Sequence, residues 1–168
     1  MNRDKKNIID AYGNKLRMRV MGICLKNDSL LLVRHKSLGP NGTLYAPPGG
    51  GMEFGESAES TLKREFLEET GLEISLKRFM FTHEFLDPPL HAIELFFEVQ
   101  IEGGKLTTGI DPEMASKDQI IQKVDFFQYK KLYQSDKTNL HHALKKCGTL
   151  DELLKLSGYH KFENKSLK

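Results

Sequence analysis

The stretch SAESTLKREFLEETG, Ser57 to Gly71, is the most clearly delimited element of this 168-residue sequence. It opens on a serine that favours the N-cap position, contains no internal glycine or proline, and ends on a glycine that favours a C-terminal stop. The stretch therefore predicts a helix from Ala58 to Thr70.

The acidic residues of this helix lie on the same side as its apolar residues. At about 100° per residue, Leu62 and Phe66 fall near 40° and 80° from the first helical residue, which defines a buried stripe. Glu69 and Glu65 fall near 20° and 340° on the same wheel. Leu67 points the opposite way, which predicts that the helix is covered on both sides.

A glutamate-rich helix is most often a solvated face, but its position on the wheel weakens that interpretation here. Glu65 repels both Glu68 and Glu69, and partial burial raises the cost of that repulsion. Arg64 can compensate one acid but not three. Closely grouped carboxylates are the ligands that a hard divalent cation such as Mg²⁺ selects, so the helix predicts a metal site.

The segment before the helix, PPGGGMEFGES, brings a glycine-rich turn to the helix N-terminus. Backbone N–H groups there can approach an anion without obstruction by a Cβ atom. Such a loop is more often a simple turn, and it matches no P-loop. Next to a carboxylate cluster, it predicts a substrate that contains phosphate.

Apolar runs on both sides of the helix predict strands. These runs are LRMRVMGICL from Leu16, SLLLVRHK from Ser29, LEISLKRFMFTHEF from Leu72, HAIELFFEVQI from His91 and IIQKVDFFQY from Ile120. EGGK, Glu102 to Lys105, predicts a turn that gives the fourth run a hairpin partner. Short helices are expected near 139–146 and 150–156, and the tail YHKFENKSLK is expected to fray.

Composition narrows the function classes. The 25 Lys and Arg residues against 23 Asp and Glu residues leave a net charge of +2, so bulk charge predicts neither DNA binding nor an anionic membrane surface. No apolar run reaches the roughly 20 residues of a membrane span. Cys24 and Cys147 lie far apart without zinc-ligand spacing, which favours a cytoplasmic protein.

The segment GGMEFGESAESTLKREFLEETGL, Gly50 to Leu72, resembles the Nudix box G-x5-E-x7-R-E-U-x-E-E-x-G-U, with U a bulky apolar residue. All fixed positions match. They are Gly50, Glu56, Arg64, Glu65, Phe66, Glu68, Glu69, Gly71 and Leu72. The order of the flanking strands extends the resemblance to about 16–133, and we expect one domain over 1–168 with a short helical C-terminal extension.

The resemblance implies an α/β fold, a Nudix-like α/β/α sandwich with a mixed β-sheet and a loop–helix–loop motif. It implies Mg²⁺-dependent attack of water on a nucleoside diphosphate linked to another moiety X, with Mn²⁺ as a substitute metal. By the resemblance, Glu65, Glu69, Glu68 and the Gly50 carbonyl hold the metal. Arg64 orients the glutamates, and Glu56 supports the loop or the metal shell.

The general base stays open between several acids. Glu68 lies within the box, whereas Nudix enzymes often take the base from a downstream loop, here IDPEMASKD. Glu113 is the first candidate in that loop, ahead of two aspartates, Asp111 and Asp118. Glu94 and Glu98 compete from a strand, although the solvated face of an antiparallel strand is the more common explanation for both.

The substrate is predicted only as a nucleotide-derived small molecule, either an ADP-ribose-like or sugar nucleotide or an NTP. Pro88 and Pro89 lie loosely where ADP-ribose pyrophosphatases carry a marker proline, but a turn explains them equally well. His141 and His142 are expected at the surface. Three phenylalanines could stack on a base, but a core role is more common for such residues. They are Phe81, Phe85 and Phe96.

Two other functions and the oligomeric state also stay open. Some Nudix-like domains bind a nucleotide sugar without cleaving it and act as sensors, usually beside a DNA-binding module. The intact acid set and the lack of a recognisable basic helix weigh against a sensor, and the lack of a broad basic face weighs against RNA decapping. The sequence leaves a homodimer open.

Overall fold

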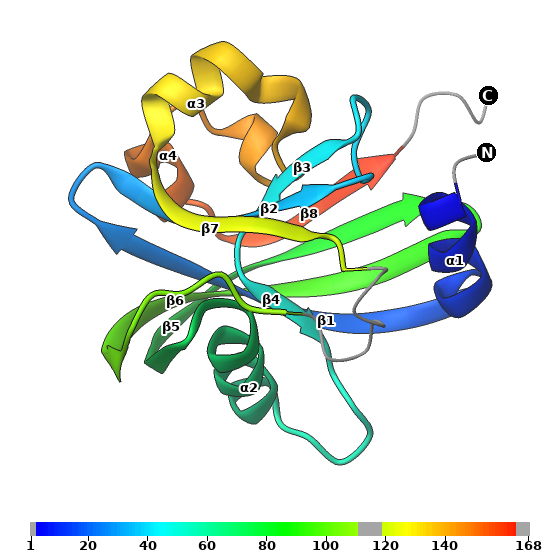
Figure 1. The fold of residues 1–168 in the computed structure, drawn as a ribbon, viewed down its shortest axis with the longest axis horizontal. Helices are drawn as coiled ribbons and strands as arrows, with labels where there is room; N and C mark the ends of the chain where they lie inside the picture. The colour runs from blue at the N-terminus through cyan, green and yellow to red at the C-terminus, as the bar shows by residue number, and fades with distance from the viewer. Residues whose placement is uncertain (1–2, 111–118, 164–168) are drawn as a thin grey trace.

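The computed structural model of the chain describes residues 3–110 and 119–163, and its elements are arranged around one mixed sheet (Figure 1). The strands are β1 Lys15–Lys26, β2 Ser29–Lys36, β3 Thr43–Ala46, β4 Gly49–Gly51, β5 Leu72–Asp87, β6 Leu90–Gly104, β7 Ile121–Gln128 and β8 Gly158–Glu163. The helices are α1 Arg3–Tyr12, α2 Ala58–Thr70, α3 Tyr129–Asp136, η2 Lys137–Asn139, η3 Leu144–Lys146 and α4 Leu150–Leu154. None of these helices is long and apolar enough to cross a membrane.

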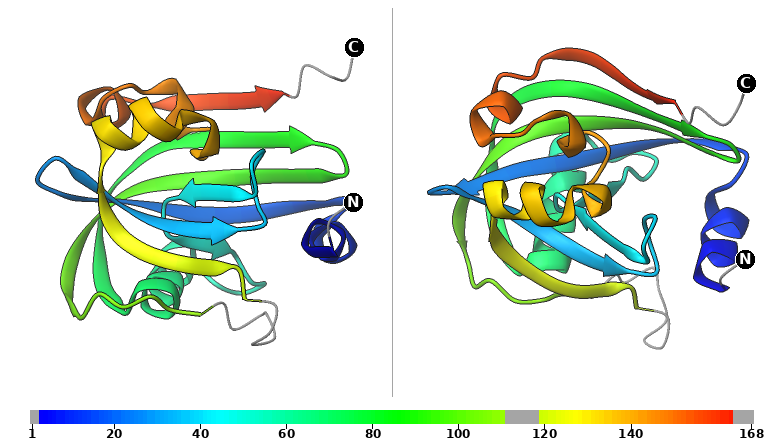
Figure 2. Two further views of the ribbon diagram at one scale, coloured as in Figure 1. Left: turned by 45° about the horizontal axis from the view of Figure 1, so that its top comes forward. Right: turned by 90° about the horizontal axis from the view of Figure 1, so that it is seen from above.

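The sheet combines parallel and antiparallel pairs in the order β3-β2-β1-β6-β5-β8, with β4 paired to β1 and β7 paired to β2. The pairs β1–β6 and β5–β8 are parallel, and the remaining named pairs are antiparallel. Helix α2 lies on one side of the sheet, and α3 and α4 lie on the other, as the two further views confirm (Figure 2). The predicted α/β class with a mixed sheet is therefore confirmed.

Helix α2 begins and ends where the sequence predicts. The Ser57 side chain accepts the Ser60 N–H, the Ser60 side chain bonds back to the N-cap backbone, and Gly71 adopts a left-handed conformation with φ 70°. Leu62 and Phe66 are fully buried against the sheet. The expected cover on the second side of the helix is wrong, because Leu67 is 55% exposed.

Each face of the sheet carries its own apolar core. The core under α2 includes Val20, Leu62 and Phe66, and the core under α3 and α4 includes Met21 and Phe96. Consecutive residues Val20 and Met21 of β1 therefore serve opposite cores, as the alternation of side chains along a strand requires. The side chains of β1 are therefore divided between the face that α2 covers and the opposite face.

Several predicted boundaries are corrected. The predicted hairpin turn at 102–105 is wrong, because β6 continues to Gly104 in register with β5 and residues 105–110 form no strand. The hairpin between β5 and β6 instead turns at Pro88 and Pro89. The tail was expected to fray, but 158–163 forms β8 along β5. Helices α1 and α3 were not predicted at all.

Candidate metal and phosphate site

Helix α2 presents its acids to the short strand β4. The Gly49 N–H donates to Glu69 Oε2 at 2.9 Å, so the buried Glu69 carboxylate is tied to the backbone of the glycine-rich loop. Gly49 has φ 146°, and a Cβ there would overlap the Val20 carbonyl oxygen, so only glycine fits. The loop is therefore held close to the helix by backbone contacts that need glycine.

Glu65 lies directly against the next glycine of the loop. An ideal Cβ placed on Gly50 would lie 2.6 Å from Glu65 Oε2 and nearer still to the rest of the carboxylate. Burial raises the pKa of Glu65 despite the opposing effect of the Arg64 charge. The carboxylate thus occupies a partly dehydrated position that favours a cation beside it.

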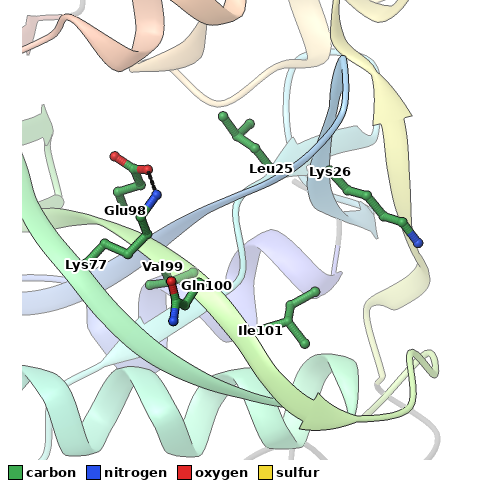
Figure 3. Close-up of a pocket in the computed structure, with 7 residues that line it drawn as sticks. All are labelled: Leu25, Lys26, Lys77, Glu98, Val99, Gln100 and Ile101. Carbon is green, nitrogen blue, oxygen red and sulfur yellow. Dashed lines mark hydrogen bonds and ion pairs between the residues drawn. The ribbon is translucent and has the colours of Figure 1, made fainter.

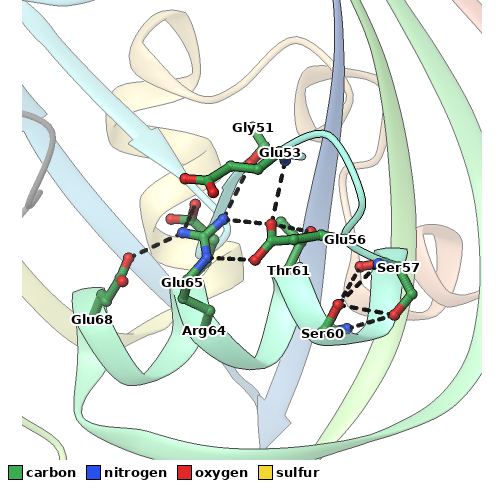
Figure 4. A network of polar contacts seen from close by, with 9 residues as sticks. All are labelled: Gly51, Glu53, Glu56, Ser57, Ser60, Thr61, Arg64, Glu65 and Glu68. Atoms are coloured by element: carbon green, nitrogen blue, oxygen red, sulfur yellow. Dashed lines mark hydrogen bonds and ion pairs between the residues drawn. The ribbon is translucent and has the colours of Figure 1, made fainter.

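Arg64 gathers three of the box glutamates (Figure 4). Its Nε and Nη2 donate to the two oxygens of Glu56 at 3.0 and 2.9 Å. Its Nη1 donates to Glu65 at 2.8 Å and to Glu68 at 3.3 Å, and Nη2 also reaches the Gly51 carbonyl at 3.3 Å. One guanidinium therefore links both ends of the loop–helix–loop motif, in agreement with the orienting role that the resemblance implies.

Glu56 is held as a charged partner of this arginine. The hydrogen bond from Arg64, together with one from the Thr61 hydroxyl at 2.8 Å, lowers the pKa of Glu56 to about 2. The Glu53 N–H also donates to Glu56 at 3.3 Å. These contacts favour a structural role in the loop for Glu56 rather than direct metal binding.

The residues present fit a divalent cation by their chemistry. A Cβ at Gly50 would fill the space beside the Glu65 carboxylate, and two further carboxylates, Glu68 and Glu69, come from the same helix. Oxygen donors of this kind are those that Mg²⁺ and similar ions prefer. In residues 3–110 and 119–163, however, no three His, Cys, Asp or Glu side chains converge in metal-ligand geometry. Glu65 and Glu68 instead accept hydrogen bonds from Arg64, and Glu69 accepts one from the Gly49 N–H.

The downstream candidates for the base cannot be placed. Glu113, Asp111 and Asp118 lie outside the described residues. The chain that leads to them passes along the end of α2, where the Thr107 N–H donates to the Thr70 carbonyl at 2.9 Å and the Gly109 N–H to the Glu69 carbonyl at 2.8 Å. The assignment of Glu113 therefore stays a prediction.

The solvated-face interpretation of Glu94 is wrong. Glu94 is 2% exposed, and its carboxylate contacts His83 Nδ1 at 2.9 Å and His141 Nε2 at 3.1 Å. His141 was expected at the surface but is 7% exposed, because the segment after η2 packs His141 onto β6. Hydrogen bonding explains why these polar groups can be buried.

Glu98 lies further along β6 and pairs with Lys77 at 2.6 Å (Figure 3). It also pairs with Arg78 at 2.7 Å. It lines a surface pocket of ≈ 190 Å³ together with Lys77. Because both carboxylate oxygens bind cations of β5, Glu98 is a poor candidate for a base.

The phenylalanines proposed for base stacking divide into two groups. Phe81 and Phe96 are fully buried and stack on each other with ring centroids 4.4 Å apart, so both belong to the core. Phe85 is partly buried and stacks on Phe162 of β8. None of these three rings is among the residues of the candidate site.

Arg19 and the two histidines that contact Glu94 were not predicted as residues of the site. Arg19 Nη1 lies 3.6 Å from Glu94 Oε1. The sequence contains a signal for Arg19, because Arg17 and Arg19 alternate with apolar residues along β1 and so share one face. His83, by contrast, reaches Glu94 only through the pairing of β5 with β6.

Comparison with known proteins places this geometry in a family. A model of the NUDIX domain matches residues 15–146, which includes the acids of α2, the glycine-rich loop and most of the sheet. The chain belongs to the Nudix family. The suspected family resemblance is therefore confirmed.

One curated relative of this Nudix chain is an ADP-ribose pyrophosphatase of Methanocaldococcus jannaschii, which is 36% identical over 98 residues. The alignment covers 57% of this chain and 57% of that relative, so the chain matches little more than half of the relative's length.

Solved structures confirm the Nudix fold. A NUDIX hydrolase from Nitrosomonas europaea superposes with a TM-score of 0.66 at 18% identity and covers 83% of this chain and 88% of that one. An ADP-ribose pyrophosphatase from Streptococcus suis superposes with a TM-score of 0.57 at 17% identity, covering 85% of this chain and 98% of that one. At these identities the likeness concerns the fold alone.

Proposed function

We propose that this Nudix protein is a divalent-metal-dependent pyrophosphohydrolase that cleaves a nucleoside diphosphate linked to another moiety X. Water attacks one phosphorus, and the products are a nucleoside monophosphate and phosphorylated X. The observation that carries the proposal is the contact of Glu65 with Gly50, beside the Glu69 carboxylate bound to Gly49, within a complete Nudix box.

In this proposal Glu65, Glu68, Glu69 and the Gly50 carbonyl hold the metal, with Mg²⁺ as the expected ion and Mn²⁺ as a substitute. A bound divalent cation lowers the pKa of a coordinated water and offsets charge on the phosphoryl oxygens. Arg64 keeps the glutamates oriented, since it already bonds Glu65 and Glu68. The protein contributes mainly position and charge, as is usual in phosphoryl transfer.

The base is proposed from the remaining acids. Glu113 is the first candidate, and Glu68, with a side chain 28% exposed at the edge of the site, is the alternative within the box. Glu94 is a poor base. Although burial alone would raise the pKa of Glu94, the charge of His141 and hydrogen bonds from His141 and His83 hold that pKa well below its usual range. A carboxylate with so low a pKa and no access to water accepts a proton poorly.

ADP-ribose-like compounds are the first substrates to test, because the name of the M. jannaschii relative supports them. Nucleotide sugars and NTPs or dNTPs remain the other classes. The deciding assay is hydrolysis by the purified protein, in Mg²⁺ and in Mn²⁺, of ADP-ribose, nucleotide sugars, dNTPs, NADH and dinucleoside polyphosphates, with release of nucleoside monophosphate as the readout.

Glu69→Gln serves as the matched variant, since it keeps the size of the side chain and removes its charge. Cleavage of one class by the wild-type protein, much reduced by the variant, is the expected result. No cleavage of any compound, with metal-dependent binding of one of them, would instead favour the non-catalytic sensor.

A further inference from the structure

Arg19 lies where β1 is flanked by β6 on one side and by β4 on the other. Its register partners are Glu94 in β6 and Gly51 in β4, next to the pair of Val20 with Gly50. Since Val20 faces the core under α2, Arg19 projects from the opposite face of the sheet. Arg19 therefore borders the glycine-rich loop from the side that α2 does not cover.

The Arg19 side chain is only partly engaged by the protein. Its Nη1 lies 3.6 Å from Glu94 Oε1, its side chain is 29% exposed, and its buried Nε has no hydrogen-bond partner among residues 3–110 and 119–163. A guanidinium carries five N–H donors, so donors remain for an acceptor that comes from outside the chain.

Two histidines from separate parts of the chain hold the Glu94 carboxylate, which anchors Arg19. His83 of β5 and His141 of the C-terminal segment both contact Glu94 Oε2. The Ala143 N–H donates to His141 Nδ1 at 3.3 Å, so the proton of a neutral His141 ring lies on Nε2, facing Glu94. Burial lowers the pKa of His83, which favours its neutral form. Arg19, whose guanidinium stays protonated, is a permanently charged partner of Glu94.

A surface pocket lies beside the strands that carry Arg17 and Gly51, although Arg19 itself is not among its lining residues. This pocket of ≈ 260 Å³ is lined by Gly51 and by Arg17, the next residue of β1 on the same face. The Arg17 guanidinium stacks on the Tyr12 ring of α1 at 3.7 Å from its centroid, and a Cβ on Gly51 would lie 3.2 Å from Arg17 Nη2. Two fixed guanidinium groups thus border the loop that carries the candidate metal site.

We propose that Arg19 is a substrate-binding residue that bonds an anionic oxygen of the nucleotide on the Gly51 side of the site, and that Glu94, held by His83 and His141, positions it. Planar guanidinium groups suit phosphate oxygens, and a fixed donor loses less entropy on binding than a mobile one. The charge of Arg19 is near enough to act on Glu65, where it opposes the rise in pKa caused by burial. A stabilising role does not by itself explain the pair of Arg19 with Glu94, because a buried ion pair often adds little to stability.

The inference rests on the proposed function for its substrate, and binding without turnover separates the two. Binding of ADP-ribose, AMP and inorganic pyrophosphate is measured by calorimetry in EDTA, where no metal-dependent hydrolysis occurs. Hydrolysis of ADP-ribose in Mg²⁺ is measured separately. Arg19→Ala should weaken binding of at least one phosphate ligand about 10- to 100-fold, as expected for a lost hydrogen bond to a charged group. Arg19→Lys should bind that ligand more tightly than Arg19→Ala and less tightly than the wild-type protein.

The other end of β6 provides matched controls. Glu98 occupies the same face of β6 as Glu94, also pairs with an arginine, and lies about 13 Å further along the strand. Arg78→Ala and Glu98→Gln should therefore leave both binding and KM unchanged, whereas Arg19→Ala and Glu94→Gln should raise KM with a smaller effect on kcat.

A double-mutant cycle tests the positioning role of Glu94. If Glu94 acts through Arg19, Glu94→Gln should weaken binding in the wild-type background but not in the Arg19→Ala background. Equal binding by Arg19→Ala and the wild-type protein, with only the melting temperature lowered, would show a purely structural ion pair and overturn the inference. The same conclusion would follow if the wild-type protein bound none of the three probes at millimolar concentration. Absence of hydrolysis with retained Arg19-dependent binding would overturn the proposed catalysis and leave the binding residue in place.

Discussion

Replacing Gly50 by alanine tests directly whether the Glu65 carboxylate belongs to a working site. The added methyl group would lie 2.6 Å from Glu65 Oε2, whereas ordinary contacts begin near 3.4 Å. The carboxylate must therefore withdraw by about 1 Å, because Gly50 is fixed in register with Val20. A misplacement of about 1 Å in a catalytic group can cost about 100-fold in rate, or ~2.7 kcal/mol in the barrier.

The assay is kcat/KM for the substrate that the panel identifies, at saturating Mg²⁺, with the melting temperature measured alongside. Gly103→Ala is the matched control in β6, away from the site, because its methyl group would also meet a carboxylate, with Glu73 Oε2 at 3.2 Å. Gly50→Ala should lose about 100-fold in kcat/KM with a small change in melting temperature, and Gly103→Ala should lose much less. Equal activity of both variants and the wild-type protein would refute the assignment of Glu65 to the metal site.

Three further results are expected. Glu69→Gln should keep or slightly raise the metal-free melting temperature, since the amide oxygen can still accept the backbone N–H of β4 at 2.9 Å and repulsion is relieved, while hydrolysis falls by decades. The hydrogen bond from Arg64 lowers the pKa of Glu56 to about 2, so the stability that Glu56 contributes should be present above pH 4.5 and lost as the pH falls toward 2. The melting temperature of the wild-type protein should fall over this pH range, and Glu56→Gln should lack this contribution to the fall. Gly22→Ala should destabilise the fold by about 1–3 kcal/mol in denaturant titrations, because its methyl group would lie 2.6 Å from Phe66 Cζ.

Each of these expectations has a contrary outcome. Large metal-free destabilisation of Glu69→Gln with activity retained would exclude the metal role of that residue. If the melting temperature of Glu56→Gln depended on pH in the same way as that of the wild-type protein, the bond between Glu56 and Arg64 would not be maintained in solution. Wild-type stability of Gly22→Ala would mean that helix α2 can move away from β1.

The sequence determined the helix α2 and the identity of the acids on it. Ser57 and Gly71 define its ends through local hydrogen bonds and a left-handed conformation, and Leu62 and Phe66 define its buried face. These are short-range effects, which depend on residues at most a few positions apart. For the same reason the pairing of Arg64 with Glu68, four residues along the helix, could be predicted, whereas its contact with the adjacent Glu65 could not.

Only the tertiary structure decided what surrounds that helix. Glu94 reads as a solvated residue of an amphipathic strand, yet it is buried because His83, His141 and Arg19 converge on it from three other segments. The end of β6 and the pairing of the tail as β8 likewise depend on which strands lie alongside. Pairing between distant strands and the burial of a charge follow from long-range contacts, which hydrophobic periodicity does not encode.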